Sequence, residues 1–150
     1  MKKRVGTAIL LVGIALLTIV VAVIHLNTRT DVPEGALRIV VGNAETTLAL
    51  SDLQLTQVTG TIVNAKGDER KIDAQGIPVC TVLSQAEITE LSQVKVIADD
   101  EYHAVLTAEE ALAPEGVYFI MQEEGSVQLI VFGDTNSKRN VSDVVCMEVS

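Results

Sequence analysis

The chain opens with an uncharged apolar stretch. Val5 to Leu26 is a run of 22 residues without a Lys, Arg, Asp or Glu. A helix of this length spans about 33 Å at about 1.5 Å per residue, and the hydrocarbon core of a bilayer is about 30 Å thick. The stretch therefore predicts one transmembrane helix over residues 5–26. The following residues, 27–35, contain Asn, Thr, Asp, Pro and Gly and are expected to form a short linker.

The flanking charges predict the orientation of this helix. Lys and Arg occupy residues 2–4, whereas Arg29 on the other side is offset by two nearby acids. Because positive flanks remain in the cytoplasm, residues 1–4 are expected there and residues 36–150 outside it. The protein would then be a single-pass protein of the cell membrane. A cleaved signal peptide is the alternative, but its apolar region is normally about 7–15 residues long and ends in a small-x-small site, which residues 21–26 lack.

Beyond the linker, apolar and β-branched residues come in short runs separated by turn residues, which is typical of β-strands. Thr59–Val63 and Glu69–Asp73 flank a polar, glycine-containing segment over residues 64–68, and this arrangement predicts a β-hairpin. Further strands are expected at Leu37–Val41, Thr46–Leu50, Gln93–Ala98, Tyr102–Leu106, Val117–Met121, Ser126–Phe132 and Val144–Val149.

Three short helices are expected between these strands. Ser51–Gln54 and Thr107–Glu110 each have the spacing of a capping box. A third helix is predicted after Gly76-Ile77-Pro78, with the proline in its first turn, where a missing amide costs nothing. The order of elements predicts an α+β domain over residues 36–150, with a mixed or antiparallel, β-rich architecture and short helices, preceded by the one N-terminal transmembrane helix.

Charge excludes one class of partner. The chain has 11 Lys and Arg against 20 Asp and Glu, a net charge of −9. Three of the basic residues precede the apolar stretch, so the remaining eight stand against all 20 acids and give the rest of the chain a charge of −12. A nucleic-acid surface needs clustered positive charge, so no nucleic-acid partner is expected. An acidic domain is also repelled by anionic lipid.

Five short motifs follow one another along the expected domain. They are Thr47–Leu53, Gly76–Pro78, Asp100–Tyr102, Gln128–Asp134 and Lys138–Val141. Their order resembles that of the sulfite-oxidase-type molybdopterin-binding domain, and the resemblance covers most of the region from residue 37 to residue 149. It implies the fold of that family. In its enzymes the scaffold holds a molybdopterin cofactor and supports oxidoreductase activity.

The resemblance also implies that a metal ligand is missing. In the family, a cysteine thiolate binds molybdenum at the position where this chain has Asn64, and an amide cannot supply a soft anionic sulfur. Glu101 and Phe132 replace the family's Gly and Pro in two further motifs. We therefore expect no catalytic residue, no metal and no cofactor. Molybdopterin enters only under the alternative that the chain is a molybdopterin-dependent oxidoreductase or a subunit of one.

Three segments supply candidate ligand-binding residues. Asn64 stands at the position just described. Tyr102 and His103 follow an acidic run, and they form either a proton-donor or metal site or a solvated turn that enters a strand. The loop over residues 133–140 either holds an anion, through amides and a guanidinium, or is an ordinary solvated connection. The candidate residues are Asn64, Tyr102, His103, Ser137, Lys138 and Arg139.

Cys80 and Cys146 allow either one disulfide, which an extracytoplasmic domain would permit, or two buried thiols. The sequence contains no nucleophile elbow, phosphate-binding glycine-rich loop or dinucleotide-binding fingerprint. These patterns together predict a membrane-anchored, extracytoplasmic, non-catalytic module on a sulfite-oxidase-like scaffold. It is expected to bind a partner protein or a small ligand, beside a membrane redox system.

Overall fold

The computed structural model describes residues 32–150. The predicted cytoplasmic terminus, the predicted anchor over Val5 to Leu26 and most of the linker lie outside the described residues. Within residues 32–150, no helix combines the length and the hydropathy needed to cross a membrane.

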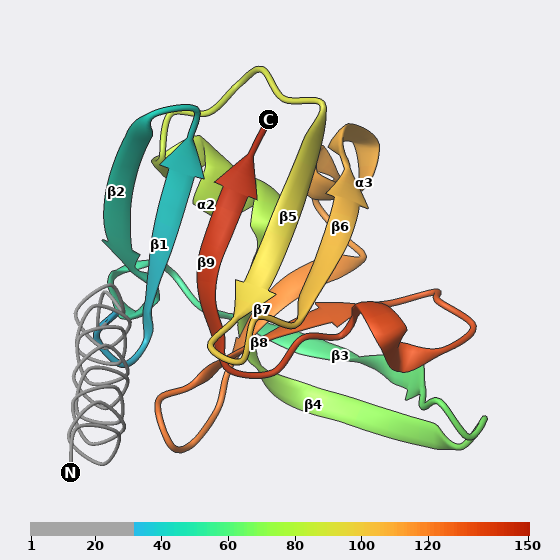
Figure 1. The fold of residues 1–150 in the computed structure, drawn as a ribbon. Coiled ribbons are helices and arrows are strands. Elements are labelled where there is room, and N and C mark those ends of the chain that lie inside the picture. Colours follow the sequence, from blue (N-terminus) through green and yellow to red (C-terminus); the bar gives the residue numbers. More distant parts are fainter. Residues whose placement is uncertain (1–31) are drawn as a thin grey trace, which may run out of the picture. The chain divides into compact units, whose positions relative to one another are not determined.

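The described residues form two β-sheets (Figure 1). The first sheet has the order β2-β1-β9-β5-β6, and the second has the order β3-β4-β7-β8. Strand β1 runs parallel to β9, whereas every other pair of neighbouring strands is antiparallel. The first sheet contains β1 (Ala36–Val41), β2 (Ala44–Ala49), β5 (Gln93–Ala98), β6 (His103–Thr107) and β9 (Val144–Val149). The second contains β3 (Thr56–Val63), β4 (Glu69–Pro78), β7 (Val117–Met121) and β8 (Val127–Val131). The expected α+β class with a mixed, β-rich architecture is confirmed.

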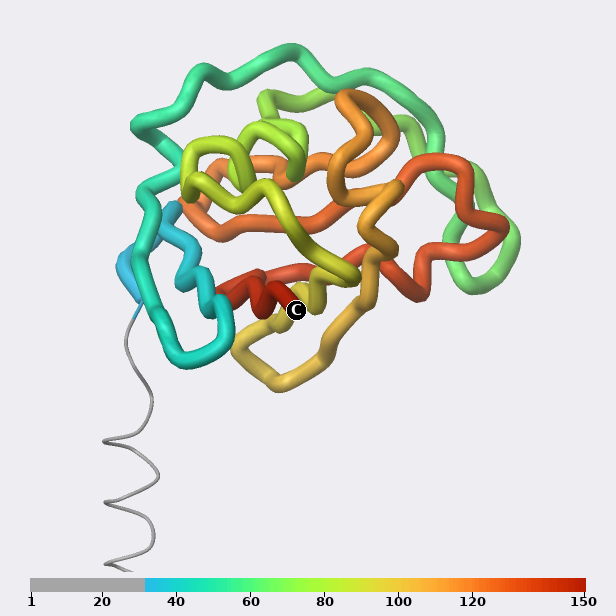
Figure 2. Tube along the Cα trace, turned by 90° about the horizontal axis from the view of Figure 1, so that it is seen from above, coloured from blue at the N-terminus to red at the C-terminus, as the bar shows by residue number. Residues whose placement is uncertain are grey.

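The main core lies between the first sheet and a layer that contains β7, β8 and the helices α2 (Val79–Gln85) and α3 (Ala108–Leu112). Figure 2 shows the first sheet on one side and these elements on the other. Alternation explains the arrangement: Val94, Val96 and Ala98 of β5 are buried, while the residues between them are at least partly exposed. Phe119, on β7, is the largest fully buried side chain of the described residues.

The helix predictions are confirmed in part. The Thr107 side chain accepts a hydrogen bond from the Glu110 backbone, and the Glu110 side chain accepts one from the Thr107 backbone, which completes the capping box at α3. The helix predicted at Ser51 is wrong, because Leu50–Asp52 forms a single 3-10 turn, η1, without a side-chain cap. Pro78 does not lie in the first turn of α2. Its ψ of 140° is extended, and it pairs with Tyr118 as the last residue of β4.

The cysteines are both free thiols. Cys146, on β9, is only 1% exposed. Burial raises the pKa of its thiol, although the nearby Arg38 guanidinium acts in the opposite direction. Cys80 is half-buried at the start of α2. Of the two alternatives for these residues, the structure therefore has free thiols rather than a disulfide.

Helix α2 ends with a strained residue. Glu87 has a φ of 58°, and its N–H donates to the Ser84 carbonyl while the Ile88 N–H donates to the Leu83 carbonyl. This is the Schellman arrangement, in which glycine is the usual residue. We expect Glu87→Gly to raise the free energy of unfolding by about 1 kcal/mol, because a residue with a Cβ is disfavoured in the left-handed region.

Urea denaturation of the full chain in detergent micelles measures this change. Glu90→Gly is the matched control, since Glu90 is exposed and is not among the residues with positive φ. There glycine should only add freedom to the unfolded chain and lower stability slightly. A Glu87→Gly variant no more stable than the wild type would contradict the strain.

Candidate functional site

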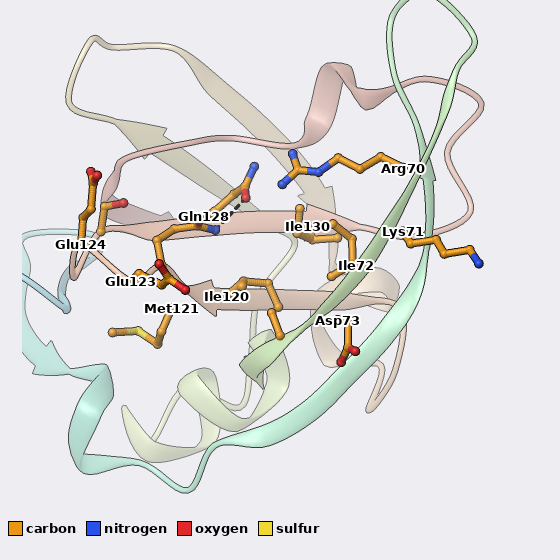
Figure 3. Close-up of a pocket in the computed structure, with 13 residues that line it drawn as sticks. Arg70, Lys71, Ile72, Asp73, Ile120, Met121, Glu123, Glu124, Gln128 and Ile130 are labelled. Carbon is orange, nitrogen blue, oxygen red and sulfur yellow. Dashed lines mark hydrogen bonds between the residues drawn. The ribbon is translucent and has the colours of Figure 1, made fainter.

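The largest of the three described pockets is a cleft of about 530 Å³ beside strand β4. Figure 3 shows β4 crossing at an angle to β7 and β8, whose outer face forms the floor of the cleft. Ile120 and Ile130 lie on this floor, and Ile72 approaches them from β4 (Figure 3). The lining residues are Arg70, Lys71, Ile72, Asp73, Ala74, Ile120, Met121, Gln122, Glu123, Glu124, Ser126, Gln128 and Ile130.

A second, smaller hydrophobic cluster holds the β3–β4 hairpin over β7 and β8. It contains Val58, Ile62, Ile72, Ile120 and Ile130, all buried. Partly buried neighbours pack against it. Among them, the rings of Tyr118 and Phe132 make an edge-to-face contact with centroids 5.9 Å apart. Because these side chains are packed from both layers, the floor of the cleft has a defined shape.

Strand β4 has an open edge along the cleft. It pairs with β3 over its whole length from Glu69 to Gly76, but with β7 only over Gly76–Pro78. On the side away from β3, residues 69–75 have no strand partner among the described residues. Five consecutive β4 residues, 70–74, line the cleft. Since neighbouring side chains of a strand point to opposite faces, a consecutive run indicates that the strand presents its edge to the cleft.

The charges of the cleft lie on opposite sides. The exposed Arg70 side chain extends over Ile130 towards Gln128, whereas Lys71 points away (Figure 3). Across the floor, Glu123 and Glu124 form an exposed acidic rim. Within the described residues, Arg70 has no carboxylate at ion-pair distance, in contrast to Arg38, Lys95 and Arg139.

Five of the six residues predicted as a site lie near one loop. Ser137–Arg139 forms the 3-10 turn η2, and the hydroxyl of Tyr102, just before β6, donates to the Lys138 carbonyl. His103 is the first residue of β6 and is exposed. None of the six predicted residues, Asn64 included, lines any of the three described pockets.

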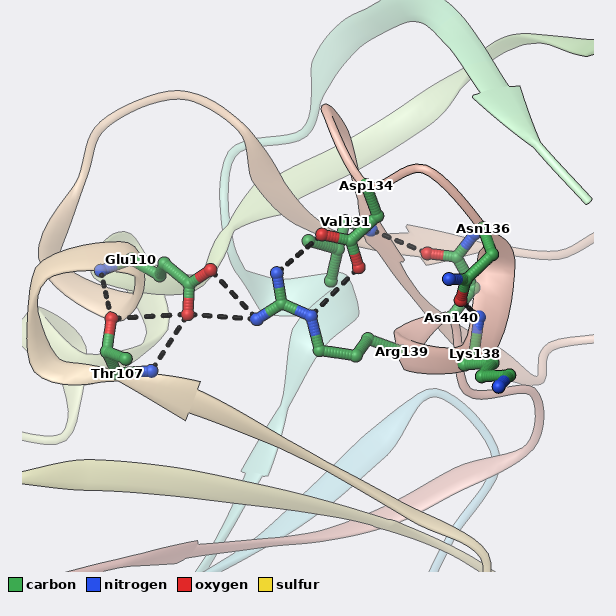
Figure 4. Close-up of polar contacts among 8 residues, drawn as sticks. All are labelled: Thr107, Glu110, Val131, Asp134, Asn136, Lys138, Arg139 and Asn140. Carbon is green, nitrogen blue, oxygen red and sulfur yellow. Dashed lines mark hydrogen bonds and ion pairs between the residues drawn. The ribbon is translucent and has the colours of Figure 1, made fainter.

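Arg139 is held by carboxylates of the same chain (Figure 4). Its Nε and Nη2 donate to Asp134 at 2.8 and 2.6 Å, and Nη1 donates to both Glu110 oxygens at 2.8 and 3.0 Å. Hydrogen bonding to Asp134 raises the pKa of the guanidinium above its ordinary value, and the bond to Glu110 adds to the effect. The guanidinium predicted to hold an anion thus ties η2 to the N-terminal turn of α3.

Asn64 organises the turn of the β3–β4 hairpin. Its Oδ1 accepts from the backbone N–H groups of Lys66 at 2.8 Å and Asp68 at 2.9 Å, and its Nδ2 donates to the Asp68 carboxylate at 3.1 Å. Figures 1 and 2 both place this hairpin beside the loop over residues 133–140. Asn64 nevertheless shares no hydrogen bond with that loop.

Sequence reasoning missed the β4 cleft, because its lining residues were assigned only to strands and turns. One signal was available: Arg70 shares a strand face with Ile72 and Ala74, and a charge in an apolar row is uncommon. Neither cysteine lines a described pocket, and no group of three or more His, Cys, Asp and Glu side chains within residues 32–150 could hold a metal ion. No protein-family model matches the chain, and no curated protein matches it.

Proposed function

We propose that the protein is a membrane-anchored, extracytoplasmic, non-catalytic module that binds a partner protein through the cleft beside β4. One observation carries the proposal: an open strand edge along a cleft, with a cation on one side and two carboxylates on the other. Backbone groups and separated charges are features by which proteins recognise extended peptide segments. The uncharged run over Val5 to Leu26 supports the membrane anchor.

A sulfite-oxidase-like scaffold remains part of this proposal, on the order of the sequence motifs. The amide of Asn64, at the position of the family's metal-binding thiolate, is used by the hairpin turn. This supports a scaffold role for the position rather than metal binding. Metal and cofactor analysis of the purified full chain tests the point. Stoichiometric molybdenum with extractable pterin would favour the alternative, a molybdopterin-dependent oxidoreductase or a subunit of one.

Cysteine labelling tests the proposed location. A cysteine introduced at the exposed Thr47 should react with a membrane-impermeant maleimide in intact spheroplasts, whereas one introduced at Lys3 should react only after lysis. The wild-type chain corrects for labelling of Cys80. The reverse pattern would contradict the orientation.

Site-specific photo-crosslinking tests binding at the cleft. A photoreactive residue at Glu123, on the rim, should form a discrete adduct with one protein in native membranes. Glu109 is the matched control, because it is an exposed glutamate on α3 that does not line the cleft. Identical adducts at both positions, or none at Glu123, would contradict partner binding at this site.

A further inference from the structure

We infer that the partner supplies an extended segment that adds to β4 as a new strand and carries an acidic side chain opposite Arg70. The inference rests on the proposed binding function of the cleft and specifies its mode. An unpaired strand edge offers a row of N–H and C=O groups at fixed spacing, which an extended chain satisfies and a helix does not.

The length of the open edge suits such a segment. Residues 69–75 lack a strand partner on the cleft side within the described chain. At about 3.3 Å per residue these seven residues extend over about 20 Å, the length of an ordinary strand. Alternate residues of this stretch direct their backbone groups towards the cleft, because the others are bonded to β3.

The floor would select the side chains of the added strand. Every second side chain would face the cleft, where Gln122, Ser126 and Gln128 are partly exposed, and the remaining ones would face solvent. Ile130 is fully buried and Ile120 is 3% exposed, so these two side chains are already covered within the fold and offer almost no apolar surface to the segment. Small or polar residues such as Thr are therefore expected at the alternate positions that face the cleft.

Charge would fix the placement of the segment. Arg70 is exposed and has no ion-pair partner among the described residues, and its guanidinium lies over the floor (Figure 3). Glu123 and Glu124, on the opposite side, likewise have no ion pair within this part of the chain. A segment with one acidic and one basic side chain complements both sides, whereas a uniformly charged one does not.

Edge protection is the competing explanation, because charged side chains also guard open strands against aggregation. Protection alone does not require a cleft of about 530 Å³ beside the edge. The two explanations differ in whether an added strand binds.

Fluorescence anisotropy with the full chain in detergent micelles tests the inference. The probe is a blocked, labelled peptide of about seven residues with alternating Val and Thr, one Glu and one Lys. A second probe carries N-methyl groups on alternate backbone amides, which removes strand hydrogen bonds but keeps every side chain. We expect the first probe to bind saturably. The affinity of the second probe should be lower by about tenfold or more.

Variants test the charge. Arg70→Glu should lower the affinity for the first probe about tenfold. A probe with Lys in place of its Glu should bind this variant with the affinity restored. Arg70→Gln gives an intermediate loss. Lys66→Glu is the matched control, since it makes the same charge change at an exposed hairpin residue outside the cleft. Circular dichroism confirms that each variant is folded.

Each result has a separate meaning. Equal binding of the N-methylated probe overturns strand addition, and no effect of Arg70→Glu overturns the acidic contact with Arg70. Both results leave the Glu123 crosslink as support for partner binding. No binding of either probe, with that crosslink present, overturns only this inference. A chain that is dimeric by sedimentation and excludes the probe assigns the edge to a second copy and also overturns it.

Discussion

Gly76→Ala should lower the free energy of unfolding by about 2–3 kcal/mol, because there is no room for a Cβ at this position. An added Cβ would lie 2.8 Å from the Phe119 carbonyl oxygen and 2.6 Å from Ile120 Cδ1. The carbonyl belongs to the backbone of β7, and Gly76 pairs with Ile120 at the point where β4 leaves that strand. Relief of the clash would therefore have to move the strand pair. Urea denaturation of the full chain measures the loss.

Gly60→Ala provides the matched comparison. Its Cβ would lie 2.5 Å from Phe132, a nominally worse clash. Phe132 is only partly buried, however, and its ring atoms are the far end of a side chain that can rotate. We expect a loss of about 1 kcal/mol. A loss at Gly60 equal to or larger than that at Gly76 would show that backbone proximity does not decide the cost.

Local sequence patterns determine several of the strands and one of the helix caps. Strands at 93–98, 117–121 and 144–149 have the predicted bounds, because their burial alternates or is continuous as the residues suggest. The Thr107 capping box was predicted from spacing alone, since both of its partners are local. Such features depend on few residues close in sequence.

The end of β4 could not be predicted in this way. Glu69–Asp73 was expected as the strand, but pairing with β3 continues to Gly76, and β7, some 40 residues later, pairs with the strand from there to Pro78. Gly76 reads locally as a break, whereas in the structure it is the position where two strands come too close for a side chain. Strand order across a sheet is likewise a tertiary property, as the parallel β1–β9 pair illustrates.

The same distinction between local and long-range features applies to the candidate site. Sequence reasoning singled out the loop over residues 133–140 for its positive charge, but it did not reveal that Glu110, 29 residues earlier, binds Arg139. Nor did it reveal the cleft, which exists because a hairpin folds over a distant strand pair. Each of these features depends on a long-range contact, and the local sequence around one residue does not indicate which distant residue it contacts.

Arg139→Gln should lower the free energy of unfolding by about 1–2 kcal/mol near neutral pH, because two carboxylates lose their shared cation. The Arg139, Glu110 and Asp134 side chains are 32%, 31% and 22% exposed, so solvent screens the arrangement only in part. Lys95→Gln is the matched control. The Lys95–Glu148 pair is longer, at 3.4 Å, and more exposed, so its loss should cost at most about 0.5 kcal/mol.

The dependence on pH identifies the titrating partner. Burial raises the pKa of the Glu110 carboxyl, but the Thr107 backbone hydrogen bond and the hydrogen bond and charge of Arg139 outweigh it and leave the pKa below its ordinary value. A carboxyl with a depressed pKa stabilises the fold above its unfolded pKa, and this stability is lost as the pH falls through the folded pKa. The difference between wild type and Arg139→Gln should therefore be constant above about pH 5 and shrink below pH 4.5.

Glu110→Gln separates this carboxyl from the other acids. Glutamine retains the capping geometry but carries no charge, so the variant should lose part of the wild-type stability near pH 7. Its free energy of unfolding should then fall less steeply than that of the wild type as the pH drops into the acidic range. Urea denaturation at a series of pH values measures all three proteins. If Glu110→Gln declines as steeply as the wild type, the Glu110 carboxyl does not carry the acid sensitivity of this contact. A difference between wild type and Arg139→Gln that instead stays constant as the pH falls would show that Arg139 stabilises the loop by packing and not by charge, because protonating its partners would then remove nothing.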